Sequence, residues 1–438
     1  MDRQTLIEKM IDSQTAVLSG SRLIKSAISN TAMLLAEEDE EEKTEPKRGG
    51  SVKGRSRNLP RDFAGGYQRL FQDYFSDSPV YTDELFRRRF RMHRSLFLRI
   101  VHDIEAHDRY FAQKKDAVGK PGLHPFQKIT SAICMLAYGG SADANDEYLR
   151  ISESTALESL NRFCTAIIEV YGQEYLRYPT ADDMKRILAI NEKRGFPGML
   201  GSLDCMHWGW KNCPAAWKGQ FQGKEKEATV VLEAVVSQDL WFWHAFFGLP
   251  GSHNDINILN VSPLFTKLLN GVAPKCEFTI NGNKYEQGYY LADGIYPDYA
   301  TLVKTISQPQ GLERKHFAKM QEALRKDVER AFGVLQARFS IVAQPARGWN
   351  KLNLNRIMVA CIILHNMIVE DERDSPHDHE YDVLSTSSAT VHPARSDLAG
   401  FSQFVKNYQD IRDKQAHHQL KNDLIKHLWA LKGRSEEI

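Results

Sequence analysis

The spacing of hydrophobic residues changes near residue 179 and separates a helical part from a mixed part. Over 83–106, apolar residues recur every three or four positions, which predicts an amphipathic helix. Further helices are expected at 125–138, 143–151 and 154–171. Pro125 suits the start of one helix and Ser152 suits a cap before another. Three short helices with a tight turn before the last are compatible with a helix-turn-helix that contacts DNA, and equally with a unit that only packs.

After residue 179 the apolar segments are shorter and rich in valine and aromatic residues, as strands are. Strands are expected at 199–204, 228–236, 240–249 and 288–293. The turn at 237–239 predicts that the second and third strands form part of an antiparallel meander. Helices are expected at 251–269, 315–339, 353–370 and 401–432. We therefore predict an α/β fold, a mixed sheet with flanking helices, preceded by an all-α, helix-turn-helix-like domain.

Length and composition favour more than one folded unit. The chain has 438 residues, 42% of them hydrophobic, which is enough for two cores. The predicted division is a mostly disordered region at 1–62, a helical DNA-binding or assembly domain at 63–178, a mixed α/β domain at 179–372, a flexible linker at 373–400 and a C-terminal amphipathic helix at 401–438. That last helix suits docking of a partner or a second copy, and also packing on its own domain.

Charge is informative only locally, because the net charge is +1. An acidic block at 37–42 precedes a basic arm at 47–57. The cations of this arm are Lys47, Arg48, Lys53, Arg55 and Arg57, with no acid among them. The arm suits a nuclear-localisation signal, a tether to the DNA backbone or a solvated linker. A second stretch, 85–102, contains six arginines and no acid.

The cysteines and the hydropathy of the chain indicate in which cellular compartment the protein is expected. The six cysteines show neither zinc-site spacing nor a disulfide framework, which is typical of reduced thiols in an intracellular protein. We find no secretory segment and no apolar run near 18 residues, so nothing in the pattern predicts export or membrane insertion. Cys205, His207 and Cys213 have a spacing that fits no usual zinc site.

Three carboxylates lie where predicted elements end or turn. Asp204 and Asp293 fall at strand ends, and Glu329 lies on a helix after 35 intervening residues. Acids brought together from two strands and a helix can hold a pair of divalent cations, Mg²⁺ or in its place Mn²⁺, and so activate a phosphodiester and its attacking water. Each acid also has an ordinary interpretation. For the two aspartates it is turn chemistry, and for Glu329 it is an i,i+4 pair with Arg325.

Other polar residues are candidates for supporting roles. Asp255 is a rival second acid, although its place in a first helical turn favours capping. His253 and His207 could orient an acid or contact phosphate, or be structural. The candidates for phosphate contacts around Glu329 are Arg325, Lys326, Arg330 and Arg338, for which ordinary surface charge is the alternative.

Four long motifs carry a resemblance to a known family. They are GSLDCMHWGWKNCPAAWKG, PGSHNDINIL, YYLADGIYPDYATLVK and QEALRKDVERAFGVLQARF. In this order they resemble the catalytic domain of PIF/Harbinger transposases, with the plant Pong/Ping-like branch most similar. The pieces RGGSVKGRSRN, FRRRFRMHRSLFLRIV and HLW also resemble that branch, so the likeness covers roughly 47–432. The resemblance implies a ribonuclease H-like fold whose Asp-Asp-Glu triad corresponds, motif by motif, to Asp204, Asp293 and Glu329.

The resemblance also implies a function. We expect a nuclear, homo-oligomeric enzyme that cuts the terminal inverted repeats of an element with two Mg²⁺ ions and joins them to A/T-rich target DNA. A Myb-like DNA-binding protein from the same element is the expected partner, and without it the enzyme is also expected in the cytoplasm. A domesticated, catalytically silent DNA- or chromatin-binding adaptor is the alternative. A metal-dependent repair nuclease is a third.

Overall fold

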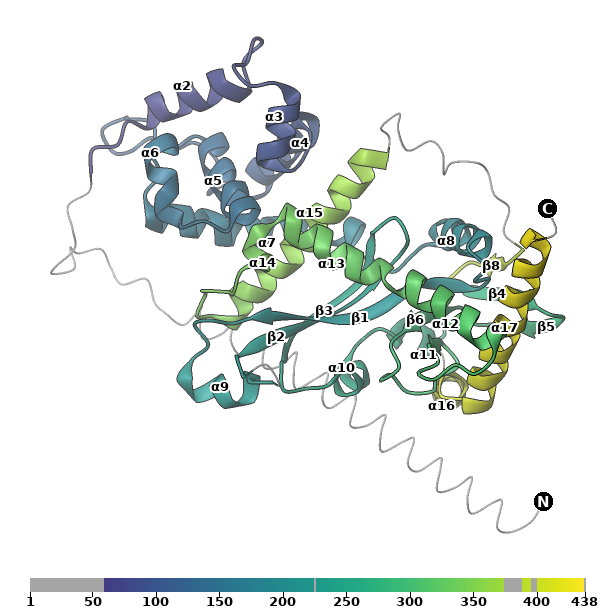
Figure 1. The fold of residues 1–438 in the computed structure, drawn as a ribbon. Coiled ribbons are helices and arrows are strands. Elements are labelled where there is room, and N and C mark those ends of the chain that lie inside the picture. The colour runs from purple at the N-terminus through teal and green to yellow at the C-terminus, as the bar shows by residue number, and fades with distance from the viewer. Residues whose placement is uncertain (1–58, 224–225, 374–387, 395–399, 437–438) are drawn as a thin grey trace.

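A helical region is followed by a five-stranded sheet with helices on both faces in the computed structural model, which describes residues 59–223, 226–373, 388–394 and 400–436 (Figure 1). The observed fold is thus mixed α/β, as predicted. The predictions for residues 1–58, including the basic arm at 47–57, lie outside the described residues.

The helical region matches the prediction at 125–138, but the single helix predicted at 83–106 is two helices, broken where Arg91 adopts the left-handed conformation. Its elements are α2 (Phe63–Tyr74), α3 (Asp83–Phe90), α4 (Arg94–His107), α5 (Pro125–Tyr138), the 3₁₀ turn η1 (Ala142–Asn145), α6 (Asp146–Leu149), α7 (Glu153–Tyr175) and α8 (Ala181–Lys193). Pro125 occupies the first turn of α5, as expected. Ser152 precedes α7 but makes no capping bond to its backbone. The helix predicted at 143–151 is a short 3₁₀ turn followed by one α-helical turn.

The main sheet has the strand order β3-β2-β1-β6-β7. Its strands are β1 (Met199–Gly209), β2 (Thr229–Val236), β3 (Phe242–Pro250), β6 (Tyr289–Ala292) and β7 (Leu302–Lys304). The first three form the predicted antiparallel meander, whereas β6 and β7 continue the sheet in parallel with β1. Helix α9 (Ala215–Phe221) lies between β1 and β2 in the chain.

Two long helices expected in the second half are each divided in two. The segment 251–269 contains α10 (Asp255–Val261) and α11 (Thr266–Leu269), separated at Pro263, which has no N–H to continue a helix. The segment 315–339 contains α12 (Leu312–Arg325) and α13 (Asp327–Arg338), followed by α14 (Ser340–Ala343). Helix α15 (Lys351–Arg373) is apolar and long enough to span a membrane, but 78% of its most apolar window is buried in the protein, as in a core helix.

A second, smaller sheet was not predicted. Its strands β4 (Lys275–Ile280), β5 (Asn283–Tyr285) and β8 (Thr390–His392) are ordered β5-β4-β8. Because β8 pairs with β4, the described part of the expected linker 373–400 is not simply a connection. The expected C-terminal helix is α16 (Phe401–Ile411) followed by α17 (Lys414–Glu436). Leu424 and Leu428 of α17 are buried, and α17 packs on α12, so this helix covers its own domain.

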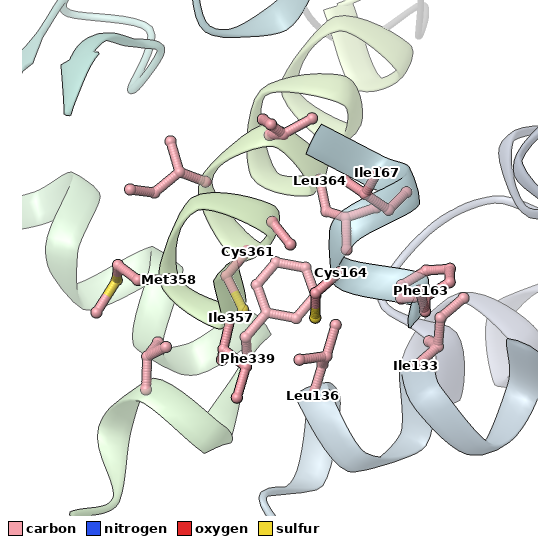
Figure 2. Close-up of a cluster of buried hydrophobic side chains, with 14 of the residues drawn as sticks. Ile133, Leu136, Phe163, Cys164, Ile167, Phe339, Ile357, Met358, Cys361 and Leu364 are labelled. Atoms are coloured by element: carbon pink, nitrogen blue, oxygen red, sulfur yellow. The ribbon is translucent and has the colours of Figure 1, made fainter. Parts of the chain in front are cut away.

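The main sheet separates two hydrophobic cores. One core joins the helical region to α13 and α15 on one side of the sheet, and the other lies between the sheet, α8, α12 and α17. Figure 2 shows the first core where α5 and α7 meet α15, with Cys164 facing Cys361 and Phe339 between the helices. The boundary predicted between 178 and 179 falls between α7 and α8, and packing is continuous across it.

Candidate active site

The register of two parallel strands brings two of the predicted acids together. Ser202 of β1 is aligned with Leu291 of β6. Asp204 comes two residues after Ser202, and Asp293 comes two residues after Leu291. The two aspartates therefore lie at the same level of the sheet. Neighbouring strands are about 4.8 Å apart, so both carboxylates can reach one bound group.

Asp204 is held on β1 with little exposure to solvent. Its side chain is 18% exposed, and its two oxygens accept hydrogen bonds from the Cys205 backbone N–H (2.8 Å) and the Arg325 guanidinium (3.0 Å). Burial raises the pKa of Asp204 to about 6, and the negative charges of Asp255 and Glu329 act in the same direction, against the two donors. A carboxyl group at such a site gains from any further cation that approaches it.

Glu329 reaches this site through Arg325. The Glu329 carboxylate pairs with the Arg325 guanidinium at 2.7 Å, which is the i,i+4 pair that the sequence offered as the ordinary interpretation. The same guanidinium also binds Asp204, so one arginine joins two of the three predicted acids. The end of α12 is fixed against β1 by the Ser202 hydroxyl, which donates to the Leu324 carbonyl (3.0 Å).

Asp255 is closer to the site than its capping role suggested. Asn254 is the residue that caps α10, by accepting from the Asn257 N–H, and this leaves the Asp255 carboxylate free of that task. Burial raises the pKa of Asp255, with Asp293 among the neighbouring charges that raise it further. His207 acts in the opposite direction and so lies near Asp255, as a supporting residue would. Asp255 is thus a further acid whose charge acts on Asp204 and which Asp293 affects in turn.

The remaining site candidates have simple surroundings. Asp293 is exposed, and its Oδ1 accepts from the Gly294 N–H (2.6 Å), which is the predicted turn contact. His253 is half-buried in the loop before α10, and its Nδ1 has no hydrogen-bond partner in the described chain. Within the described residues, no three His, Cys, Asp or Glu side chains are arranged to hold a metal ion, and Arg325 pairs with two of the acids.

The phosphate-contact candidates divide into two kinds. Lys326 and Arg330 are exposed, although Arg330 pairs with Asp327 (2.6 Å). Arg338 was a wrong choice. Its guanidinium lies inside the protein, bound to Glu372 (2.7 Å) and near His365 Nδ1 (3.2 Å), because this turn of α13 packs against α15.

The charge of α7 bears on the helix-turn-helix interpretation. Helix α7, which would read DNA, has Glu153, Glu158, Glu169 and Glu174 on its exposed positions. Its one base, Arg162, pairs with Glu158 and Asp108. A surface of this charge repels phosphate, which favours the alternative that the α5–α7 unit only packs.

A polar cluster beneath the site was missed by sequence reasoning. Glu233 of β2 is fully buried opposite Cys205 of β1. Its carboxylate accepts from Ser262 and binds His244 (3.0 Å), which fixes the C-terminal end of α10 to the sheet. The only signal in the sequence was an acid inside an otherwise apolar strand. All six cysteines are free thiols, and Cys205, His207 and Cys213 form no zinc site.

Comparisons with known proteins show what this chain is similar to. The family described as plant transposon protein matches residues 173–376, and a domain of unknown function matches residues 66–105. The Arabidopsis thaliana protein named "Protein ALP1-like" is 25% identical over 62% of this chain and 68% of its own length. No solved structure matches.

Two further relatives are more distant. The A. thaliana protein "Antagonist of like heterochromatin protein 1" is 22% identical over 56% of this chain, which spans 62% of that relative. The human protein "Putative nuclease HARBI1" is 19% identical over 63% of this chain and 79% of its own length. The chain therefore resembles transposase-like proteins, and the plant transposon protein family matches it over residues 173–376.

Proposed function

We propose that this protein is a metal-dependent DNA nuclease and transposase whose active site comprises Asp204, Asp293 and Glu329. The observation that carries the proposal is the place of Asp204 on β1 and of Asp293 just past the end of the parallel strand β6, with Glu329 joined to Asp204 through a shared arginine. Asp255 is the added member of the acid set, since its charge acts on Asp204.

The strand order supports a ribonuclease H-like fold for residues 179–372. In that fold an antiparallel meander is extended, next to its first strand, by two parallel strands. The order β3-β2-β1-β6-β7 with β6 and β7 parallel to β1 has this form. The fold places acids on the first strand, after the fourth and on a late helix, and Asp204, Asp293 and Glu329 have these positions.

The donor set suits hard divalent cations. Carboxylate oxygens are the ligands that Mg²⁺ and Mn²⁺ prefer, and the half-buried carboxyl of Asp204 is poorly compensated by one arginine. Bound there, two such ions would polarise a phosphodiester and lower the pKa of an attacking water. Asp204, Asp293 and Glu329 would hold the ions, and Arg325 would be released from the two acids that it now pairs with.

The wider setting of the activity follows from the same proposal. The DNA substrates are terminal inverted repeats and an A/T-rich target, handled by an oligomer together with a Myb-like DNA-binding protein in the nucleus. A second possibility, a DNA- or chromatin-binding adaptor without cleavage, is favoured by the position of Arg325, which neutralises two of the acids.

Nicking of a supercoiled plasmid by the purified full chain tests the proposal. We expect nicking with Mg²⁺ or Mn²⁺ and none with EDTA. Asp204→Asn and Asp293→Asn should each reduce it by more than roughly 100-fold, beyond the usual effect of residues outside the metal ligands. Asp182→Asn, an exposed aspartate paired with Lys185, is the control. Binding of DNA by a protein that never nicks, with or without the Myb-like partner, would select the adaptor.

A further inference from the structure

The positive charge of the helical region gathers on α3 and the turn that follows it. Of its arginines, Arg87 pairs with Glu372 (2.6 Å) and Arg94 with Asp83 (2.8 Å). These two are neutralised. The neighbouring Arg88, Arg89 and Arg91 have no carboxylate partner among the described residues, which leaves a cationic group at one end of α3.

Arg89 is held in place without being neutralised. Its guanidinium donates to the Tyr74 hydroxyl and lies over the Tyr81 ring, 3.9 Å from the centroid. Both partners are neutral phenols. Stacking and a neutral hydrogen bond orient a guanidinium while its charge remains available to an anion.

Arg91 is fixed in a similar way. It ends α3 in the left-handed backbone conformation, with φ of 65°. Its guanidinium donates to the Arg88 carbonyl (2.9 Å) and lies 5.3 Å from the centroid of the Tyr138 ring. Its Nε is buried and has no partner in the part of the chain that the structure describes. A donor of this kind predicts an acceptor that is not part of the protein.

Of these arginines, Arg89 lies in the wall of a cavity of about 290 Å³ between α2, α3, α5 and α6. Tyr138 and Tyr148 line the same cavity, and Arg91 adjoins it through its contact with Tyr138. Thr130, which is only 2% exposed, presents a hydroxyl with no partner among the described residues to the same cavity. The one carboxylate in the lining, Asp73, accepts from the Tyr148 hydroxyl. The cavity therefore combines an oriented guanidinium, phenols and an unpaired hydroxyl, as an anion site does.

We propose that this cavity binds a backbone phosphate of DNA and that α3, rather than α7, is the DNA-facing helix of the helical region. The inference rests on the proposed function, because it assigns a second contact to the same substrate. The position of the cavity supports this proposal. The Tyr138 carbonyl accepts from Gln344 (3.4 Å), just beyond α14, so the cavity adjoins the segment that continues from α13 and Glu329. Helix α13 spans only about 18 Å, within the length of a short duplex.

Fluorescence anisotropy with a labelled 20-base-pair duplex tests this in EDTA, where cleavage plays no part. The test variant is Arg88→Gln/Arg91→Gln, which leaves the packing of Arg89 intact. Two lost phosphate contacts should weaken binding by roughly 10-fold and lower the slope of log K against log salt by about 2. Arg89→Gln should weaken binding as well. Arg162→Gln on α7 is the matched control, expected to bind within about twofold of wild type.

The outcomes separate this inference from the proposed function. Unchanged affinity and salt slope in Arg89→Gln would overturn the cavity as a DNA site, and unchanged values in Arg88→Gln/Arg91→Gln would overturn α3 as the DNA-facing helix, even if the plasmid is still nicked. Equal loss in Arg162→Gln would overturn the preference for α3 over α7. Failure of wild type to bind the duplex in EDTA would also overturn the inference. Melting temperatures of all variants within about 2 °C of wild type exclude unfolding as the cause of weaker binding.

Discussion

Arg325 is the residue on which the interpretation of the candidate site turns. Its guanidinium, 14% exposed, lies between Asp204 and Glu329 and so occupies the place that a cation would take. Two carboxylates sharing one arginine form a site with excess negative charge. A divalent ion that binds both must displace the guanidinium, and the arginine therefore sets how tightly the ion binds.

Replacement of this arginine by glutamine should have opposite effects on stability and on metal affinity. Without metal, Arg325→Gln leaves Asp204 and Glu329 without a counter-ion and should lower the free energy of unfolding by about 1–3 kcal/mol. With metal, the competing cation is gone, so calorimetric titration should show tighter Mn²⁺ binding. Lys326→Gln, one residue away and exposed, should change neither. Weaker Mn²⁺ binding by Arg325→Gln would show that the arginine supports the site instead.

His365 makes the stability of the protein dependent on pH. It is fully buried, where its Nε2–H donates to the Leu240 carbonyl (2.9 Å) and its Nδ1 accepts from Arg338 (3.2 Å), so the neutral ring satisfies both bonds. Burial, and secondarily the charge of Arg338, lowers its pKa to about 3, from an ordinary value near 6.5.

Acid should therefore destabilise the fold through this histidine. The unfolded chain takes up a proton on His365 below pH of about 6.5 while the folded chain does not, so its stabilising contribution is complete above that pH and is lost as the pH falls towards 3. Urea unfolding between pH 7 and 4 measures the slope. His365→Asn should flatten it, whereas His102→Asn, on an exposed side chain, should leave it unchanged. Equal slopes in wild type and His365→Asn would contradict the assignment.

Single residues were predictable where local sequence determines their position. Asp204 and Asp293 follow apolar runs, and the helical spacing of Arg325 and Glu329 gives their pair. The bond from Arg325 to Asp204 crosses 121 positions of sequence and has no local signal. The same holds for Arg338, which looks like a surface base in the helical pattern and is buried only because α15 covers it.

Among elements, the acidic end of α15 is the one that binds the helical region through charged groups. Three consecutive acids of α15 make these contacts. Glu370 accepts from the Tyr175 hydroxyl (2.6 Å), Asp371 binds His93 (2.7 Å), and Glu372 binds both Arg87 of α3 and Arg338 of α13. This end of α15 therefore connects α3, α4 and α7 to the helix that carries Glu329.

Removal of the charge at the centre of these contacts should loosen α3 and α13 together. Glu372→Gln leaves Arg338 without a carboxylate in a largely buried place and should cost about 1–3 kcal/mol of stability. Amide hydrogen exchange should quicken in both α3 and α13. Glu169→Gln, at an exposed pair with His107, should change stability by less than about 0.5 kcal/mol. Faster exchange in α13 alone would show that the link to α3 through Arg87 carries no energy.

Single helices and the meander were predicted well from their hydrophobic pattern. Strands whose partners are short or distant in the chain were predicted badly. The boundaries of α5 are those expected, and the meander of β1, β2 and β3 was recognised from its apolar runs and turn. Strand β4 alternates between exposed and buried residues and was nevertheless missed, because its partners β5 and β8 are short and β8 lies far along the chain. The parallel pairing of β6 with β1 depends on the whole intervening chain.

For the whole molecule, the central feature is that the helical region and one face of the sheet share a core. Composition predicts two cores correctly, but the sheet rather than the domain boundary separates them. Phe163 of α7, Cys361 of α15 and Phe332 of α13 belong to the same cluster. We therefore expect the helical region and the sheet to unfold together.

Tryptophan fluorescence can distinguish one cooperative unit from two, because all seven tryptophans lie at or after position 208. Phe163 is fully buried in the helical region, and Phe163→Ala should cost about 3–5 kcal/mol through the cavity that it leaves. If the core is shared, the midpoint of urea unfolding falls equally by tryptophan fluorescence and by circular dichroism. Leu157→Ala, on the exposed side of the same helix, should leave both midpoints nearly unchanged. A tryptophan transition that is unaffected by Phe163→Ala would mean that the sheet folds independently, and the candidate site would then not depend on the helical region for its stability.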